Sequence, residues 1–240
     1  GWQDAAVAEP SKSQVKKAGS TMRKFFRGEL PGHDAVDRAM AAVETIEAFR
    51  AAHATPLVSA NNGLRSMLRT ERCPVEVSQR LKRMTTILDK LRREPTLALA
   101  SMQDIGGVRA ILDDVAQIRR VEARLMRNRP VVGYSDYITS PRASGYRGVH
   151  VVVTYGEADR PIEVQLRTKV MHEWAITVER LGGNLGQNFK QDGDTPVQRF
   201  MAVVSEAMAI EEQGGEPPLD LVRRISRARA EMLPYLEGNR

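Results

Sequence analysis

The sequence predicts an α/β (α+β) fold in which a helical N-terminal part precedes a mixed sheet and further helices close it. Two changes of pattern carry this prediction. Apolar residues recur at helical spacing from Ser11 to about Arg93, and after Asp104 the period changes to the alternation of strands. Helical spacing returns after about Val170. A run of strands between two runs of helices indicates helices packed against a sheet.

The N-terminal part is expected to contain helices and no strand. Ser11 is a candidate N-cap of the first helix, Pro31-Gly32 ends it, and Asp34 is the candidate cap of the second. The last helix of this part has apolar residues at helical spacing, so it presents one apolar and one basic face. The second, third and fourth helices are expected at about 34–52, 56–69 and 75–91.

The middle of the chain is expected to hold the strands. Gly106-Gly107 introduces a short alternating run at 108–112, and a second short run lies at 130–132. The clearest pattern is a hairpin of two strands, 148–155 and 161–168, because both are rich in β-branched residues and a polar turn joins them. Further helices are expected at about 115–126, 170–180, 195–213 and 219–236, with a loop at 181–194.

Composition excludes several classes of protein. With 42% hydrophobic and 28% charged residues, the chain can form a packed core. A single cysteine, Cys73, excludes an internal disulfide and a multi-cysteine zinc site and favours a reducing compartment. No apolar run reaches the ~18 to 20 residues of a membrane span. The first residues contain no apolar stretch typical of a secretory signal, so the cytoplasm is the expected location.

Positive charge is concentrated in one stretch of the chain. The whole sequence has 36 Lys+Arg against 30 Asp+Glu, a formal net charge of +6. Between Asn62 and Arg93, nine basic residues stand against three acidic ones, a surplus of six that equals the excess of the whole chain. This stretch predicts a polyanionic partner such as a nucleotide or a nucleic acid, although a solvated surface has the same composition.

Four clusters of polar residues are candidates for a functional site. The first cluster presents basic groups on one face of the fourth helix, which either hold a polyphosphate or form a solvated surface. Its members are Arg80, Lys82, Thr86, Lys90 and Arg93.

The second cluster is an acid just before a strand, Asp104, and an arginine on that strand, Arg109. An acid beside two glycines fits either a turn or a metal ligand.

The third cluster is a loop rich in small residues at 136–150. It delivers Arg142, Tyr146 and His150 to one neighbourhood. These side chains would stack on and hydrogen-bond a base, or would only pack at the start of a strand and within the sheet. The spacing of the residues leaves both readings open.

The fourth cluster lies on the second strand of the hairpin. Alternate residues share one face of a strand, so Glu163, Gln165 and Arg167 are expected side by side, facing either a cleft or solvent. A carboxylate among so many cations would be placed to hold Mg²⁺ on a triphosphate or to accept a proton.

Together and in this order, the four clusters resemble the synthetase domain of the RelA/SpoT family, the alarmone (ppGpp) synthetases. The matching stretch runs from about Arg80 to Glu179. One motif alone is weak, but four in the order of the family are highly specific. The matching segments are RLKRMTTILDKLRR, MQDIGGVRAIL, DYITSPRASGYRGVH and IEVQLRTKVMHEWA.

The resemblance implies a mixed, roughly five-stranded sheet flanked by helices. It divides the chain into a helical N-terminal region packed on the synthetase (1–74), a RelA/SpoT-like synthetase core (75–185), and a C-terminal loop with closing helices (186–240). The only His-Asp pair is His33-Asp34, so no hydrolase domain of the His-Asp type is expected. The chain thus resembles a single-domain, small alarmone synthetase.

The resemblance also implies a reaction, the transfer of the β,γ-pyrophosphate of ATP to a ribose 3′-hydroxyl with release of AMP. Asp104 and Glu163 would be the catalytic residues and would bind Mg²⁺, with Glu163 either sharing the metal or activating the acceptor hydroxyl. Arg167 would support the strand. The residues that would hold ATP are Arg80, Lys82, Lys90, Arg93 and Arg109.

On the acceptor side the resemblance is less complete. Tyr146 would stack on the acceptor base. Ser135 stands where some small synthetases carry a basic residue, and His172 stands where some carry Asn. The residues that would contact the acceptor are Arg142, Tyr146, His150, Gln165 and His172.

The resemblance leaves the acceptor open. GTP or GDP is the leading candidate, and toxic relatives that modify the 3′ end of tRNA are the alternative. A catalytically inactive member that binds a nucleotide or a partner is a third reading. An antitoxin partner and a homo-oligomer are both compatible with the sequence. The first helix resembles that of several toxin-type members; its basic residues, a possible track for phosphates, are Lys12, Lys16, Lys17, Arg23, Lys24 and Arg27.

Overall fold

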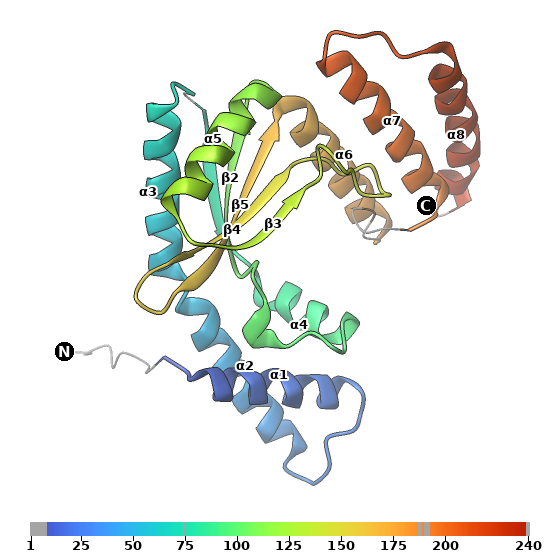
Figure 1. The fold of residues 1–240 in the computed structure, drawn as a ribbon. Helices are drawn as coiled ribbons and strands as arrows, with labels where there is room; N and C mark the ends of the chain where they lie inside the picture. Colours follow the sequence, from blue (N-terminus) through green and yellow to red (C-terminus); the bar gives the residue numbers. More distant parts are fainter. Residues whose placement is uncertain (1–8, 74, 187–188, 190–192, 239–240) are drawn as a thin grey trace, which may run out of the picture.

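The alternation that begins after Asp104 builds the centre of the molecule. A computed structural model describes residues 9–73, 75–186, 189 and 193–238. Five strands form a mixed sheet in the order β1-β2-β5-β4-β3 (Figure 1), in which only β2 and β5 are parallel among the described neighbours. The prediction of a mixed, roughly five-stranded sheet is confirmed. The strands are β1 (Val77–Leu81), β2 (Gly106–Leu112), β3 (Val131–Asp136), β4 (Val149–Tyr155) and β5 (Arg160–Thr168).

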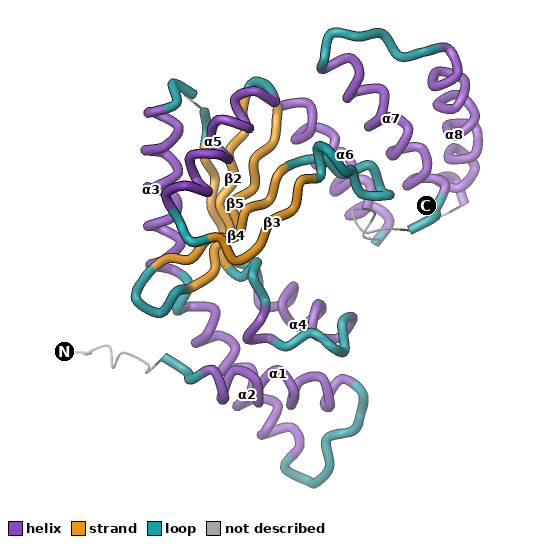
Figure 2. The backbone as a smooth tube through the Cα atoms, in the orientation of Figure 1, coloured by secondary structure: helices purple, strands orange, loops and turns teal. Residues whose placement is uncertain are grey.

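Helices surround this sheet (Figure 2). The expected order of helices and strands is found, with one exception at β1. Among the described residues, the helices are α1 (Lys12–Phe26), α2 (Ala35–Ala51), α3 (Ala54–Thr70), α4 (Met84–Arg93), the 3₁₀ helix η1 (Leu99–Ser101), α5 (Val115–Asn128), α6 (Lys169–Leu185), α7 (Pro196–Glu212) and α8 (Leu219–Gly238).

One face of the sheet is apolar, and α3 and α5 cover it. Val108, Val151 and Val164 project from the three central strands into this layer, where Leu64 of α3 and Val121 of α5 pack against them. All five side chains are at most 1% exposed. Because successive strand residues alternate, the polar residues of the same strands lie on the opposite face.

A second apolar cluster joins α1, α2, α4 and η1 into a helical unit below the sheet in Figure 1. Ser11 caps α1, since it accepts a hydrogen bond from the backbone of Gln14, whose side chain bonds back to the Ser11 amide. This predicted cap is confirmed. Asp34 precedes α2 as expected, but its side chain makes no capping bond and pairs instead with Arg38 at 3.2 Å.

The prediction of one helix at 75–91 is wrong, because its first part is an edge strand. β1 pairs with β2 from Val77 opposite Ala110 to Leu81 opposite Gly106. Tertiary hydrogen bonding therefore overrides a helical pattern of apolar residues. The predicted basic face is corrected as well: Lys82 lies between β1 and α4 rather than on a helix.

Two element boundaries also differ from the predictions. α6 continues to Leu185 instead of ending near residue 180, and Gly186, with a φ of 63°, ends it in the left-handed conformation that glycine adopts without strain. β3 continues to Asp136 because it pairs with β4 along its length. Part of the expected loop at 181–194 is therefore helical; residues 187–188 and 190–192 lie outside the described residues.

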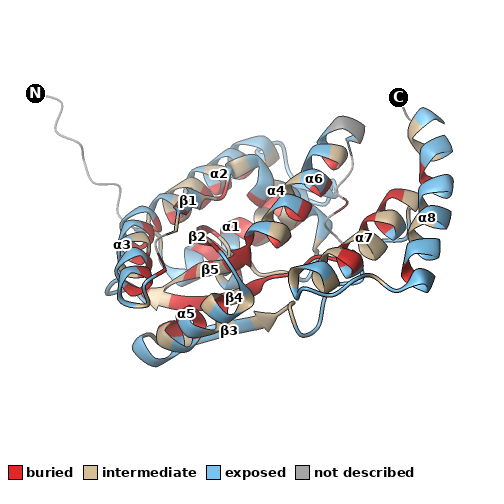
Figure 3. Ribbon diagram, turned by 90° about the horizontal axis from the view of Figure 1, so that it is seen from above, coloured by how far each residue is buried: buried red, intermediate tan, exposed pale blue. Residues whose placement is uncertain are grey.

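The last two helices form an antiparallel pair beside α6. Trp174 of α6 and Met201 of α7 lie in a third apolar cluster, to which Met232 of α8 contributes. Figure 3 shows that most of α8 is exposed and that the pair stands away from the sheet. None of the helices in the described part of the chain is both long enough and apolar enough to cross a membrane.

Candidate active site

The register of three strands places candidate residues side by side on the sheet face opposite α3 and α5. Arg109 on β2 lies beside Gln165 on β5, and Gln165 lies beside His150 on β4. One row further along, Glu163 lies beside Gly107. The backbone pairing alone therefore gathers side chains from segments far apart in the sequence.

Two cavities open on this polar face. The first, which we call the strand cavity, has a volume of about 370 Å³ and is lined by β1, β2 and β5 together with α6. Charged groups of both signs surround it. Its charged lining residues are Arg80, Lys82, Asp104, Arg109, Glu163 and Glu179.

The second, which we call the loop cavity, has a volume of about 560 Å³. The segment before β2, strands β3 to β5 and the loop after β3 line it. Asp104, Glu163 and Gln165 line both cavities, so the two spaces meet at these three side chains. The other polar residues around the loop cavity are Lys90, Ser101, Gln103, Tyr134, Ser135, Tyr137, Arg142 and His150.

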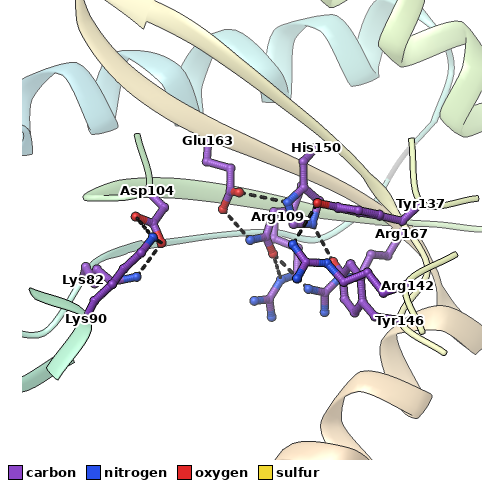
Figure 4. Close-up of polar contacts among 11 residues, drawn as sticks. Lys82, Lys90, Asp104, Arg109, Tyr137, Arg142, Tyr146, His150, Glu163 and Arg167 are labelled. Carbon is purple, nitrogen blue, oxygen red and sulfur yellow. Dashed lines mark hydrogen bonds and ion pairs between the residues drawn. The ribbon is translucent and has the colours of Figure 1, made fainter. Parts of the chain in front are cut away.

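Asp104 pairs with two lysines, Lys82 and Lys90 (Figure 4). Its Oδ2 accepts a hydrogen bond from Lys82 Nζ at 2.5 Å, and its Oδ1 lies 3.3 Å from Lys90 Nζ. A backbone bond from Lys82 N to Ile105 O, 2.8 Å long, places Lys82 beside the acid. Two cations on one carboxylate leave an excess of positive charge, which suits an incoming phosphate.

Glu163 is held by two hydrogen bonds. His150 Nδ1 lies 2.9 Å from Oε1, and Gln165 Nε2 donates to Oε2 at 2.6 Å. Burial by itself raises the pKa of Glu163, but the hydrogen bonds from His150 and Gln165 and the charge of Lys82 lower it to about 2. The carboxylate is therefore ionised at neutral pH, and such a group is better suited to binding cations and hydroxyl donors than to storing a proton.

Two arginines, Arg80 and Arg109, line the strand cavity, and a third, Arg167, lies behind its lining residue Gln165. Burial lowers the pKa of Arg109, and the positive charges of Arg167 and Arg80 lower it further. An arginine stays protonated despite such a shift, so Arg109 keeps its charge in a partly buried place beside two other cations. Arg109 also donates from Nε to Gln165 Oε1 at 3.3 Å. These charges favour a polyanion in the strand cavity.

A cluster of aromatic rings forms where the loop after β3 meets β4. Arg142 lies over the Tyr137 ring at 4.7 Å and donates to its hydroxyl at 2.8 Å. The Tyr137 ring meets His150 edge to face with centroids 5.3 Å apart. Tyr137 and Arg142 both line the loop cavity, so a planar ligand there would meet an aromatic and a guanidinium surface.

Tyr146 lies behind Tyr137 and His150 and is not among the residues that line the loop cavity. It is 5% exposed, and its hydroxyl is 2.6 Å from His150 Nε2 and 3.0 Å from Arg167 Nε. Arg167 in turn donates to Gln165 at 3.1 Å. Glu163, Gln165 and Arg167 thus share one strand face, as predicted, and Arg167 supports the other two from a buried position.

Three predicted site residues lie outside the residues that line the two cavities. Tyr146 lies behind the wall, Arg93 is exposed at the end of α4, and His172 is half-buried on α6. Sequence reasoning missed Tyr137 and Glu179. Tyr137 is part of the quoted loop motif and could have been found there, whereas Glu179 reaches the strand cavity only through the packing of α6.

The two carboxylates shared by the cavities, Asp104 and Glu163, are the residues that could hold a Mg²⁺ ion. Within the described ranges, no three His, Cys, Asp or Glu side chains gather as a metal site. Mg²⁺ does not require such a set, because proteins often bind it through one or two carboxylates together with phosphates of the substrate. Asp104 and ionised Glu163 meet that description, since both line the cavity that is rich in cations.

Comparison with known proteins shows the family of the chain. Residues 79–180 match the region found in RelA / SpoT proteins. The GTP pyrophosphokinase YjbM of Bacillus subtilis (strain 168) is 33% identical over 170 residues, which are 64% of this chain and 78% of that protein. The chain belongs to the RelA/SpoT family. The resemblance inferred from the four motifs is confirmed.

Solved structures of other proteins support the fold. The small alarmone synthetase 1 from Bacillus subtilis, bound to its product pppGpp, superimposes with a TM-score of 0.60 at 27% identity, covering 71% of this chain and 94% of that one. The Type VI effector Tas1, in complex with its immunity protein, has a TM-score of 0.50 at 16% identity, covering 73% of this chain and 98% of that one. At that identity the likeness to Tas1 concerns the fold alone.

Proposed function

We propose that this protein is a pyrophosphokinase that transfers the β,γ-pyrophosphate of ATP to the 3′-hydroxyl of GTP or GDP, making (p)ppGpp and AMP. The observation that carries the proposal is the meeting of the two cavities at Asp104, Glu163 and Gln165. A transfer reaction needs a donor and an acceptor on either side of the reacting atoms. The relative YjbM, named as a GTP pyrophosphokinase, supports the same reaction class.

In this proposal the strand cavity takes ATP. Arg80, Lys82 and Arg109 bind its phosphates, because guanidinium and ammonium groups are strong donors to phosphate oxygens. Their charge also offsets the negative charge that develops during phosphoryl transfer. Lys90, which also pairs with Asp104, reaches the same phosphates from the loop cavity.

The loop cavity takes the acceptor nucleotide. Its base packs against Tyr137 and Arg142, and its ribose lies toward Glu163. The 3′-oxygen forms a bond to the β-phosphorus of ATP, and the bond from that phosphorus to the oxygen bridging to the α-phosphorus breaks. AMP leaves with that oxygen and the electron pair, and the hydroxyl proton passes to water. Glu163 accepts a hydrogen bond from the hydroxyl and orients it, while His150 and Gln165 hold Glu163.

Mg²⁺ is part of the proposal. Asp104 and Glu163 would hold the ion, and it would offset the negative charge of the phosphates. Lys82 and Lys90, which pair with Asp104 in this structure, would bind phosphate oxygens.

The experiment is a transfer assay with the purified protein, γ-labelled ATP and Mg²⁺. GTP, GDP, ATP and deacylated tRNA are offered in turn as acceptors. Label on GTP or GDP supports the proposal. Label on tRNA would show that the same reaction uses tRNA as its acceptor. The absence of labelled product with every acceptor would contradict an enzymatic function.

The tRNA alternative has one structural observation in its favour. The cations of α1 at positions 12, 16, 17 and 24 and Arg27 directly after it are exposed, and α1 packs against α4, which carries Lys90 of the loop cavity. A phosphate backbone lying along α1 would therefore end near the acceptor side. Replacing Lys16 and Lys17 by Ala tests it: loss of labelled tRNA, with labelling of GTP intact, favours the alternative.

A further inference from the structure

The loop from Tyr137 to Gly148 has a folded shape of its own. Gly145 N donates to Arg142 O at 2.8 Å, and Tyr137 N donates to Gly148 O at 2.9 Å. Gly145 has a φ of 89°, a conformation that side chains other than glycine rarely adopt. The loop that presents Tyr137 and Arg142 is thus a defined turn, and something must hold it in place over the cavity.

Helix α7 provides that support at the turn. Ser205 Oγ donates to the Gly145 carbonyl at 2.6 Å, and Ser205 is 5% exposed. The contact is close, because a Cβ on Gly145 would lie 2.8 Å from the Cα of Ala202. The backbone of the loop therefore rests directly on the backbone of α7.

A buried ion pair makes a second attachment. Arg147 Nη1 lies 3.2 Å from Glu212 Oε2 at the end of α7, and the two side chains are only 7% and 8% exposed. Glu212 Oε1 accepts no hydrogen bond from the described residues. An arginine and a carboxylate buried together depend on each other, because either one alone would be an uncompensated buried charge.

The same loop leads to the carboxylate at the centre of the site. Tyr146, between Gly145 and Arg147, bonds to His150 Nε2 at 2.6 Å, and His150 Nδ1 bonds to Glu163 at 2.9 Å. Tyr146 also packs edge to face on Trp174, whose Nε1 donates to Met201 O of α7 at 2.8 Å. The two loop residues that are attached to α7, Gly145 and Arg147, therefore flank Tyr146, which reaches Glu163 through His150.

We propose that Ser205 and Glu212 of α7 are positioning residues for the acceptor, which act through Gly145 and Arg147 and touch neither nucleotide. The inference rests on the proposed function, since it assigns a role to α7 in that reaction. Helix α7 then supports the loop cavity directly, through the backbone of the loop, whereas it reaches the strand cavity only through α6. Substitutions of Ser205 and Glu212 should therefore change the KM for the acceptor and leave the KM for ATP unchanged.

The test compares Glu212→Gln and Ser205→Ala with the control Glu211→Gln, an exposed acid on the same helix. The two test variants should raise the KM for GTP or GDP about tenfold, the effect of weakening one charge-assisted or buried hydrogen bond, and leave the KM for ATP unchanged. The control should change neither. Equal rises in both KM values, or no rise in either, would overturn the proposal.

A second readout does not need activity. Hydrogen exchange at the amides of Tyr137 and Gly145, which the turn protects, should become faster in both test variants and not in Glu211→Gln. Unchanged exchange would overturn the proposal. If Glu212→Gln does not fold, Ser205→Ala carries both measurements. If the wild type labels no acceptor, the proposed function fails by itself, and the exchange measurement still decides whether α7 holds the loop.

A double variant separates positioning from general stability. Arg147→Met combined with Glu212→Gln removes both buried charges. If Glu212 acts through Arg147, the double variant should have a KM for the acceptor no higher than that of Arg147→Met alone. Additive rises in the KM would mean that the two residues act independently, contrary to the proposal.

Discussion

The two cavities of the site are built in different ways. Strands β1, β2 and β5 provide most of the strand cavity, and their backbone pairing fixes where Arg80, Arg109 and Glu163 lie. The outer wall of the loop cavity is a turn, in which Tyr137 and Arg142 are held by ring contacts and by α7. Charge placed on a rigid sheet suits a phosphate donor, whereas a supported loop suits the recognition of one acceptor among several.

The largest effect is expected where the two cavities meet. Glu163→Gln keeps the size of the side chain but removes the charge that His150, Gln165 and Lys82 stabilise. Transfer should fall by about 10²–10³-fold with both nucleotides saturating, the usual loss for a central electrostatic group. Initial rates of labelled product measure it. Glu157→Gln, an exposed acid in the β4–β5 turn, is the matched control; near-normal turnover of Glu163→Gln would remove that residue from the mechanism.

A smaller and selective effect is expected in the strand cavity. Arg109→Ala removes one charged donor, which should raise the KM for ATP by about 10- to 100-fold and leave the KM for the acceptor nearly unchanged. Steady-state kinetics with each substrate varied in turn give both values. Arg92→Ala, an exposed arginine on α4, should change neither. A rise in the KM for the acceptor as large as that for ATP would contradict the division between the cavities.

The aromatic wall of the loop cavity should show the opposite selectivity. Tyr137→Ala should raise the KM for GTP or GDP about tenfold, because stacking on one base contributes about 1–3 kcal/mol, while ATP binding stays intact. Tyr146→Ala should also weaken acceptor use, through the lost contact with His150. If only Tyr146→Ala does so, the base stacks on Tyr146 and the loop rearranges when the acceptor binds. A collapse of ATP affinity in either variant would contradict the assignment.

The smallest expected effect concerns the base of the loop. Burial by itself raises the pKa of Asp136, but hydrogen bonds from Thr139, Arg119 and Ile138 outweigh it and lower the pKa below 3.8, its ordinary value. A carboxylate with a lowered pKa stabilises the fold above its ordinary pKa, and this contribution is lost as the pH falls toward the pKa of the folded protein. Asp136→Asn should therefore lower Tm by about 2–4 °C at neutral pH and less at acidic pH.

Thermal unfolding of wild type and variant across this pH range measures the difference. Asp159→Asn, in the exposed β4–β5 turn, serves as the control for a lost surface carboxylate. A difference in Tm that stays constant from neutral to acidic pH would show that the charge of Asp136 does not contribute.

The sequence predicted the centre of the fold better than its edges. The β4–β5 hairpin and the shared face of Glu163 and Gln165 follow from alternation, which is a local property of the chain. β1 was missed because an edge strand with one buried residue, Val77, has the same sequence pattern as an amphipathic helix, and only its pairing with β2 decides. Lys82 and Lys90 nevertheless meet, at Asp104 instead of on one helix face.

The acceptor side could not be predicted in detail for a related reason. The motif brings Arg142, Tyr146 and His150 together, but which ring faces the cavity depends on packing against Trp174 and α7. Glu179 and the attachments of Ser205 and Glu212 come from helices whose positions no local pattern encodes. The faces of the central strands could thus be predicted from the sequence, whereas the support of the loop required the structure.

The central claim is that ATP and the acceptor meet at Asp104 and Glu163, where a pyrophosphate unit passes from ATP to the acceptor. The most direct measurement uses ATP labelled on either the β- or the γ-phosphate and follows both the label and the AMP released. We expect both labels to move to GTP or GDP together, with one AMP formed for each acceptor modified. Release of ADP with label on a single phosphate, or of labelled inorganic phosphate without a modified acceptor, would contradict it.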